Sequence, residues 1–274
     1  MASWKPAVVC MAGGLVLAAL TGCGSSAAAS SGSGVVNAVG AENEYADVMS
    51  QIGGQYVHVS SVLNNPNTDP HTFESSPSVA REVSAARLIV QNGVGYDDFM
   101  GKMESASPSA TRKVIVVQQL LGLPDNTPNP HLWYDPRTMP AVAAAVGMAL
   151  STLQPSHADY FGANVSKFDA SLVPLDNAIA AFKASYNGVP VATTEPVADY
   201  LLTAMGADNL TPFGFQADIM NGVDPTPQDV ALENGLFTKH EVKVFCYNQQ
   251  VVDDLTTSIR LNAQKDGVPV VGVY

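Results

Sequence analysis

The chain has 274 residues, of which 46% are hydrophobic and 14% are charged, a composition typical of globular rather than disordered proteins. This length suffices for two compact domains of ordinary size or for one large domain. The formal net charge of −12 argues against a nucleic-acid partner, because phosphate binding requires clustered lysine and arginine. The three cysteines cannot form a disulfide framework, and we interpret Cys246 as a small buried apolar side chain.

The first 22 residues have the layout of a secretory signal. Lys5 is the only charged residue among them, and an apolar run extends from Met11 to Leu20. This run is shorter than the roughly 20 residues that a membrane-spanning helix requires. We therefore predict that residues 1–22 are a signal peptide rather than a transmembrane anchor.

A lipid-attachment sequence follows the apolar run. Leu20-Thr21-Gly22-Cys23 resembles a bacterial lipobox, which implies cleavage before Cys23 and attachment of diacylglycerol to its sulfur. An ordinary signal peptide or a short buried helix is the alternative interpretation. Residues 24–34 contain only glycine, serine and alanine, a composition typical of a flexible tether. We predict a lipid-anchored linker at residues 23–34, with the folded body beginning at residue 35.

Residues 35–137 alternate between short apolar runs and segments with helical signals. Ser76 and Pro77, for example, are typical of a helix N-cap and of the first helical position. Alternation of this kind favours a parallel sheet with helices on both faces. We predict strands at residues 35–39, 57–63, 88–93 and 114–117, and helices at residues 43–53, 77–86 and 96–103.

A helical region, residues 138–187, separates this half of the chain from a second one. Its alanine-rich runs have high helix propensity, and we expect breaks near Pro155 and Pro174. Residues 188–274 repeat the alternation of strands and helices. The elements predicted there are strands at residues 189–193, 242–247 and 268–273, and helices at residues 197–205, from residue 227, and at residues 251–265.

The predicted fold class is therefore α/β. We expect two lobes, each with a mostly parallel sheet flanked by helices, joined by one long backbone helix. Residues 35–137 would form the N-terminal lobe and residues 188–274 the C-terminal lobe. Ligands of open parallel sheets bind beyond the carboxyl ends of the strands, so a cleft between the lobes is the expected binding site.

Three segments that follow predicted strands carry candidate metal ligands. Two contain a Pro-His pair, at His71 and His131, and the third contains Glu195 before a proline. Neutral imidazole suits divalent first-row metals, and a carboxylate adds a harder oxygen ligand. The neighbouring prolines restrict the loop backbone, which favours a preset ligand geometry. The three segments are Asp69–Glu74, Asn129–Pro136 and Thr193–Val197.

Each candidate also has an interpretation without function. A single histidine in a proline-rich loop is usually a surface residue, and Glu195 could be an acid that stabilises a helix N-terminus. Asp69, Glu74 and Asp135 fit loop caps or partners of the ligands better than ligands. The remaining histidines are interpreted as structural or solvated residues: His58, His157 and His240.

Taken in order, these segments resemble those of the zinc- and manganese-binding solute-binding proteins of ABC transporters, the cluster A-I family. The stretch Pro130-His131-Leu132-Trp133-Tyr134-Asp135-Pro136 is the most specific part, and the resemblance extends over residues 35–274. It implies two α/β lobes joined by a long helix, with the metal clamped between them. It also implies that His71, His131 and Glu195 bind the metal.

The same resemblance implies a function in metal uptake. It predicts a protein that captures Zn²⁺, Mn²⁺ or Fe²⁺ outside the cytoplasm and delivers the ion to the permease of an ABC transporter. We therefore expect a monomer on the extracytoplasmic face of the cell membrane, held there by a lipid at Cys23. A surface adhesin or interaction lipoprotein of the same fold is the alternative.

Two departures from the family pattern bear on the cargo. Glu195 stands where zinc carriers often have histidine, and residues 120–129 lack the histidines found in many of them. Both features favour manganese or iron, whereas the general order of affinities favours zinc.

The family's fourth ligand, an acid after the last strand, would fall beyond Tyr274. We therefore expect an incomplete C-terminal lobe. We do not assign the role of fourth ligand to the nearby acids Asp253, Asp254 and Asp266.

An enzyme is a less favoured class. A zinc hydrolase would combine two histidines, a carboxylate and a catalytic water, but the sequence has no His-Glu-x-x-His helix. A carrier of an organic solute would leave the two Pro-His pairs unexplained. We therefore predict a binding protein without catalytic activity.

Overall fold

The computed structural model describes Met1, residues 34–65, Phe73 and residues 76–274. Residues 2–22 of the predicted signal peptide, the lipidation residue Cys23 and the predicted ligand His71 lie outside the described residues. All the described secondary structure belongs to the unit formed by residues 32–274. Within the described ranges, no helix has the length and apolar character needed to cross a bilayer.

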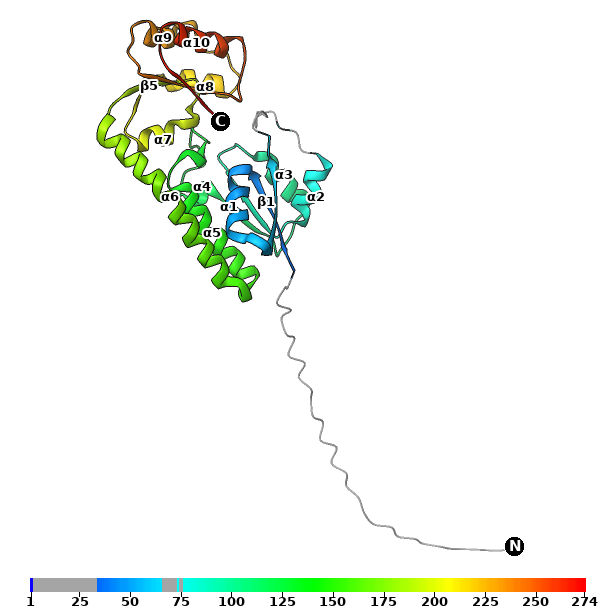
Figure 1. Cartoon of the computed structure of the whole chain (residues 1–274). Helices are drawn as coiled ribbons and strands as arrows, with labels where there is room; N and C mark the ends of the chain where they lie inside the picture. Colours follow the sequence, from blue (N-terminus) through cyan, green and yellow to red (C-terminus); the bar gives the residue numbers. More distant parts are fainter. Residues whose placement is uncertain (2–33, 66–72, 74–75) are drawn as a thin grey trace. The chain divides into compact units, whose positions relative to one another are not determined.

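The first sheet contains four parallel strands in the order β2-β1-β3-β4. Figure 1 labels its strand β1 next to helix α1. Apolar side chains on both faces of β1 and β3 are buried, as is typical of parallel strands covered by helices on both sides. Since β1 lies between β2 and β3, the strand order reverses beside β1, and this switch point is where α/β sheets bind ligands. The strands are β1 (Val36–Glu42), β2 (Val57–Leu63), β3 (Leu88–Gln91) and β4 (Lys113–Val116).

Helices cover both faces of this sheet. One core lies around Tyr45, Met49 and Phe161, where α1, α5 and α6 pack, and the other lies around Ile89 and Met100 beside α2 and α3. Ser76 caps α2 by accepting a hydrogen bond from the backbone N–H of Val79. The helices of this half are α1 (Asn43–Gly53), α2 (Pro77–Ala85), α3 (Asp98–Ala106), α4 (Val117–Leu120) and the 3₁₀ turns η1 (Gly54–Tyr56) and η3 (Leu132–Tyr134).

Two long helices follow, α5 (Thr138–Leu153) and α6 (Ala158–Tyr186), separated by the 3₁₀ turn η4 (Pro155–His157). The break expected near Pro155 is confirmed. The break expected at Pro174 is wrong, because α6 continues through this residue for a total of 29 residues. Pro174 and Ala170 are both exposed, so water can solvate the Ala170 carbonyl, which the missing N–H of Pro174 leaves without its helical donor.

The second sheet repeats the order of the first, β6-β5-β7-β8, again with parallel pairing throughout. Its strands are β5 (Pro190–Thr193), β6 (Asp208–Asn209), β7 (Val244–Asn248) and β8 (Val270–Val273). The switch point falls between β5 and β7, so the residues that follow these two strands are the ones placed to bind a ligand.

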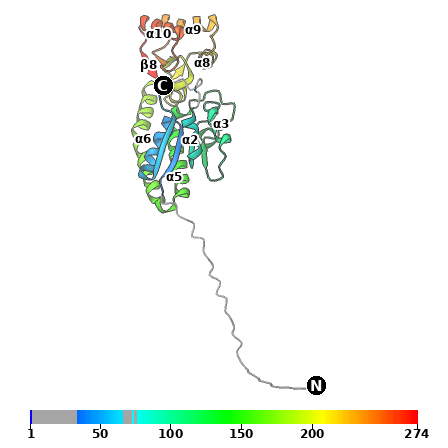
Figure 2. The ribbon, with the colours of Figure 1, turned by 90° about the vertical axis from the view of Figure 1, so that its right-hand side faces the viewer.

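One face of this sheet is covered by α8, α9 and α10 over a core that contains Phe215, Phe237 and Phe245, and α9 and α10 lie side by side (Figure 2). The other face packs Cys246 and Val191 with Leu202 of α7, so Cys246 is buried as predicted. The two-lobed α/β fold is thus confirmed, although β6 and α8 have no counterpart in the sequence prediction. The helices are the 3₁₀ turn η5 (Pro196–Ala198), α7 (Asp199–Ala204), α8 (Phe213–Met220), α9 (Pro227–Thr238) and α10 (Asp254–Lys265).

Candidate metal-binding site

His131 lies in the loop that leads into η3 and is only 4% exposed. Two aromatic rings meet its imidazole edge-on, Tyr96 at 5.8 Å and Trp133 at 5.4 Å between ring centroids. Asn129 contacts the same histidine twice: its Oδ1 lies 3.0 Å from the backbone nitrogen and 2.8 Å from Nδ1. The ring is therefore held in one orientation by packing and by hydrogen bonding.

The loop that carries His131 is fixed to the switch point of the first sheet. Asn92, the residue after β3, donates from Nδ2 to the carbonyl of Pro130 at 2.8 Å. The Oδ1 of Asn92 accepts from the hydroxyl of Tyr45 at 2.6 Å. On the other side of the loop, the hydroxyl of Thr138 donates to the carbonyl of Leu132 at 2.6 Å. All three contacts are buried. Because Asn92 directly follows β3, its contact with Pro130 places His131 near the carboxyl edge of the sheet.

Two buried acids, Glu42 and Asp97, lie beside the turn that follows β3. Burial raises the pKa of Glu42, at the end of β1, well above its usual range, and repulsion from Asp97 raises it further. Burial also raises the pKa of Asp97 to about 6, although its carboxylate accepts hydrogen bonds from the backbone N–H groups of Gly93 and Asn92. Asp97 thereby stabilises the turn from which Asn92 contacts the loop of His131.

Asp135 caps the loop that precedes α5, one of the two roles predicted for it. Its carboxylate accepts hydrogen bonds from the backbone and the side chain of Arg137, with a shortest contact of 2.6 Å. Burial by itself would raise the pKa of Asp135, but the hydrogen bonds and charge of Arg137 outweigh that effect and lower it. Asp135 thus organises the start of α5.

Glu195 follows β5 in the second sheet and is 3% exposed. Its Oε1 accepts a hydrogen bond from Nδ2 of Asn248 at 2.9 Å, and Asn248 is the last residue of β7. Asn248 is fixed in turn, because its backbone N–H donates to Thr194 Oγ1 and its Oδ1 accepts from the backbone N–H of Gln250. The carboxylate therefore lies across the switch point between β5 and β7.

The loops that carry the candidate ligands His131 and Glu195 are in direct contact. Nδ2 of Asn129 donates to the carbonyl of Pro196 at 2.7 Å, one residue beyond Glu195. The hydroxyl of Tyr200, on α7, donates to the carbonyl of Asn129 at 2.9 Å. The structure thus connects the segments that carry His131 and Glu195, although they are far apart in the sequence.

The remaining candidates are placed as follows. Asp69, His71 and Glu74 lie outside the described residues. Among the described residues, no group of three or more histidine, cysteine, aspartate or glutamate side chains has the geometry to hold a metal ion. His58 and His240 are exposed, and His157 stacks on Tyr56 at 3.8 Å. Asp253 forms a capping box at the start of α10, while Asp254 and Asp266 are respectively exposed and half-buried beside that helix.

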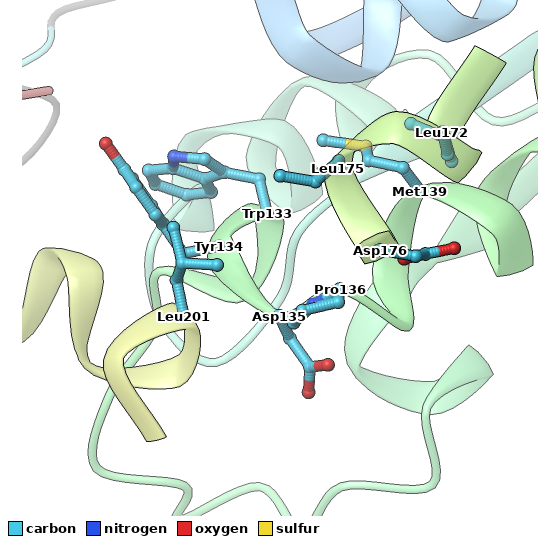
Figure 3. Close-up of a pocket in the computed structure, with 9 residues that line it drawn as sticks. All are labelled: Trp133, Tyr134, Asp135, Pro136, Met139, Leu172, Leu175, Asp176 and Leu201. Carbon is cyan, nitrogen blue, oxygen red and sulfur yellow. The ribbon is translucent and has the colours of Figure 1, made fainter. Parts of the chain in front are cut away.

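A small cavity of about 230 Å³ adjoins the segment that follows His131 (Figure 3). Its walls come from η3, the start of α5, the middle of α6 and α7, so it lies where the linking helix meets both halves. The carboxylate of Asp135 points away from the indole of Trp133, which leaves mainly apolar walls. The lining residues are Trp133, Tyr134, Asp135, Pro136, Met139, Leu172, Leu175, Asp176 and Leu201.

The sequence prediction overlooked the residues that orient His131 and Glu195. Asn129 lies in a segment that carried the family resemblance, but neither Asn129 nor Asn248 was given a role. Asn92 and the acids Glu42 and Asp97 were also overlooked. An acid at the end of a buried apolar strand, as Glu42 is, was the one available signal.

Two parallel sheets of the same strand order, connected by a long helix and presenting an imidazole and a carboxylate on loops at their carboxyl edges, define a two-lobed α/β binding protein. Residues 39–273 match the model of the family described as zinc-uptake complex component A, periplasmic, or ZnuA. The chain belongs to this family, which confirms the resemblance drawn from the motifs.

The similarity to individual curated proteins is low and covers only part of the chain. The chain is 26% identical over 164 residues to the manganese-binding lipoprotein MntA of Bacillus subtilis, a match that covers 58% of this chain and 53% of that protein. The chain thus spans about half the length of the curated relatives it matches.

Solved structures share the fold. A crystal structure of ZnuA superposes with a TM-score of 0.69 at 20% identity, covering 87% of this chain and 90% of that one. The laminin-binding adhesin Lmb of Streptococcus agalactiae gives a TM-score of 0.71 at 17% identity, with coverage of 87% and 89%. At these identities the likeness establishes the architecture alone.

Proposed function

We propose that this protein captures a divalent transition-metal ion between its lobes and delivers it to an ABC transporter for uptake. The observation that carries the proposal is the connected arrangement of His131 and Glu195. Each is buried, each is oriented by an asparagine side chain, and their loops are joined through Asn129 and Pro196. A mixed nitrogen and oxygen ligand set suits first-row divalent ions.

His71 is the proposed third ligand. It follows β2, which pairs with β1, so its loop leaves the same carboxyl edge of the sheet at which the His131 loop is anchored. Two histidines from the first lobe and a carboxylate from the second would close around the ion. The reaction is binding and release, and we assign no catalytic step to these residues.

The proposed cargo is Zn²⁺ or Mn²⁺, with Fe²⁺ as a further candidate. The family is described by zinc uptake, whereas the relative MntA is described as manganese-binding. The carboxylate of Glu195 is compatible with either ion, since zinc accepts oxygen ligands and manganese prefers them. Measured selectivity has to decide between them.

The proposed setting is the extracytoplasmic face of the cell membrane. Residues 1–22 would be the signal peptide, and lipid at Cys23 with the linker 23–34 would hold the protein beside the transporter permease. The name of MntA, a lipoprotein, supports this proposal. We propose a monomer in which residues 35–137 and 188–274 form the lobes and residues 138–187 connect them.

Metal content and affinity test this function. Residues 24–274 contain every described element from β1 onward, and this form would be purified, analysed for metals by mass spectrometry and titrated in competition with a chromophoric chelator. We expect one bound ion per chain. His71→Ala, His131→Ala and Glu195→Gln should each release it, whereas the control His58→Ala, which alters an exposed histidine on β2, should retain it. Binding that survives the substitution of both His71 and His131 would refute the proposed site.

A further inference from the structure

The hydrogen bonds around Asn129 determine which way its amide points. The carbonyl of Pro196 can only accept a hydrogen bond, so the atom of Asn129 that lies 2.7 Å from it must be the donor Nδ2. The other end of the amide, Oδ1, then faces His131. The backbone N–H of His131 donates to this oxygen at 3.0 Å, which is consistent only with the same orientation.

This orientation in turn fixes the proton on the histidine ring. Oδ1 of Asn129 lies 2.8 Å from Nδ1 of His131 and carries no hydrogen, so Nδ1 must be the donor in this contact. A neutral imidazole has a single N–H, and placing it on Nδ1 leaves the lone pair on Nε2. Metal ions bind the nitrogen that carries the lone pair, and a hydrogen bond at the other nitrogen orients the ring.

From this geometry we infer that Asn129 is a positioning residue for the metal site: it sets the tautomer of His131 and, through Pro196, couples that choice to the position of the loop bearing Glu195. The inference rests on the proposed metal-binding function for its consequence, but the tautomer itself is a property of the metal-free protein. Asn129 is 8% exposed, its side-chain amide is bonded at both ends, and its backbone carbonyl accepts a hydrogen bond from Tyr200, so the residue is held in place.

Two substitutions separate the two functions of the amide. Asn129→Ala removes both the acceptor for Nδ1 and the donor to Pro196. Asn129→Asp retains an oxygen that can accept from Nδ1 but replaces the donor with a second oxygen, which repels the Pro196 carbonyl. Asn221→Ala is the matched control, because Asn221 is an exposed asparagine whose side chain donates to the carbonyl of Ala217 in its own helix.

The tautomer would be read from the ¹⁵N resonances of His131 in metal-free protein labelled at histidine, at a pH where the ring is neutral. We expect the wild type, the Asn221→Ala control and Asn129→Asp to carry the proton on Nδ1, and Asn129→Ala to lose this preference. The metal dissociation constant of Asn129→Ala should rise about 10- to 100-fold, as is typical when a partner of a metal-bound histidine is removed. In Asn129→Asp, faster hydrogen exchange in residues 197–200 should report the lost contact with Pro196.

A wild-type ring protonated on Nε2 would overturn the inference, and so would an Asn129→Ala variant whose tautomer and metal affinity match the wild type. A wild type that has the expected tautomer but binds no metal gives a different result: it contradicts the proposed function and leaves the action of Asn129 on His131 standing. The two failures are therefore distinguishable.

Discussion

Glu233 is a buried carboxylic acid on α9. Its ionisation should make the protein less stable as the pH rises. Its side chain is 0% exposed, and its Oε1 accepts a hydrogen bond from Thr211 Oγ1 at 3.2 Å. Burial raises the pKa of Glu233 from 4.5 to about 8, and the hydrogen bond from Thr211 offsets only part of this rise. At neutral pH the group is therefore protonated in the folded protein but ionised in the unfolded chain.

The size of the effect follows from these two pKa values. Between them the folded state binds one more proton than the unfolded state, so the free energy of unfolding decreases by about 1.4 kcal/mol per pH unit. The stabilising contribution is complete below the unfolded pKa of 4.5 and is lost as the pH rises to about 8. The loss between pH 5 and pH 7 amounts to about 3 kcal/mol.

Glu233→Gln removes the titrating proton while it retains a carbonyl that can accept from Thr211. Urea unfolding of both proteins at pH 5, 6 and 7 should show that the wild type loses about 3 kcal/mol relative to the variant over this range. The exposed Glu241 provides the control, since Glu241→Gln should keep the pH dependence of the wild type. Parallel pH profiles for the wild type and Glu233→Gln would refute the reasoning.

Two further predictions concern the site and the linking helix. Asn248→Ala removes the donor to Glu195 Oε1, so the metal dissociation constant should rise about 10- to 100-fold in a competition titration; an unchanged constant would mean that other contacts suffice to hold the carboxylate. Pro174→Ala restores a helical N–H in an exposed turn of α6 and should raise the free energy of unfolding by about 2 kcal/mol. Urea unfolding checks this value, and a destabilised variant would contradict the account of α6.

The repeated alternation of strands and helices was sufficient to predict two parallel sheets, because strand-forming runs such as Val57–Leu63 and Val244–Asn248 are distinct from their helical neighbours. Residues 206–220 were harder, since glycine, proline and phenylalanine there follow neither a helical nor an alternating period and conceal β6 and α8. The break predicted at Pro174 was wrong for the opposite reason. A strong local signal was overridden by the alanine-rich helix around it and by solvent access to the freed carbonyl.

The candidate ligands could be read from short motifs, but their supporting residues could not. Asn129 contacts Pro196 across 67 residues of sequence, and Asn248 contacts Glu195 across 53 residues. Asparagine in a loop has many local uses, so composition alone gives no reason to pair these particular residues. Only the matching switch points of the two sheets bring them together.

The course of α6 has a mechanical consequence for the proposed release of a metal ion. Twelve residues separate Pro174 from the end of the helix at Tyr186, a length of about 18 Å at the usual rise per residue. A bend of about 10° at the proline would move that end by about 3 Å, and prolines are where helices bend. This displacement is comparable to the 2.7 Å contact between Asn129 and Pro196. If the proposed function holds, a transporter that bends this helix by about 10° would separate the loop of His131 from that of Glu195 without unfolding either lobe.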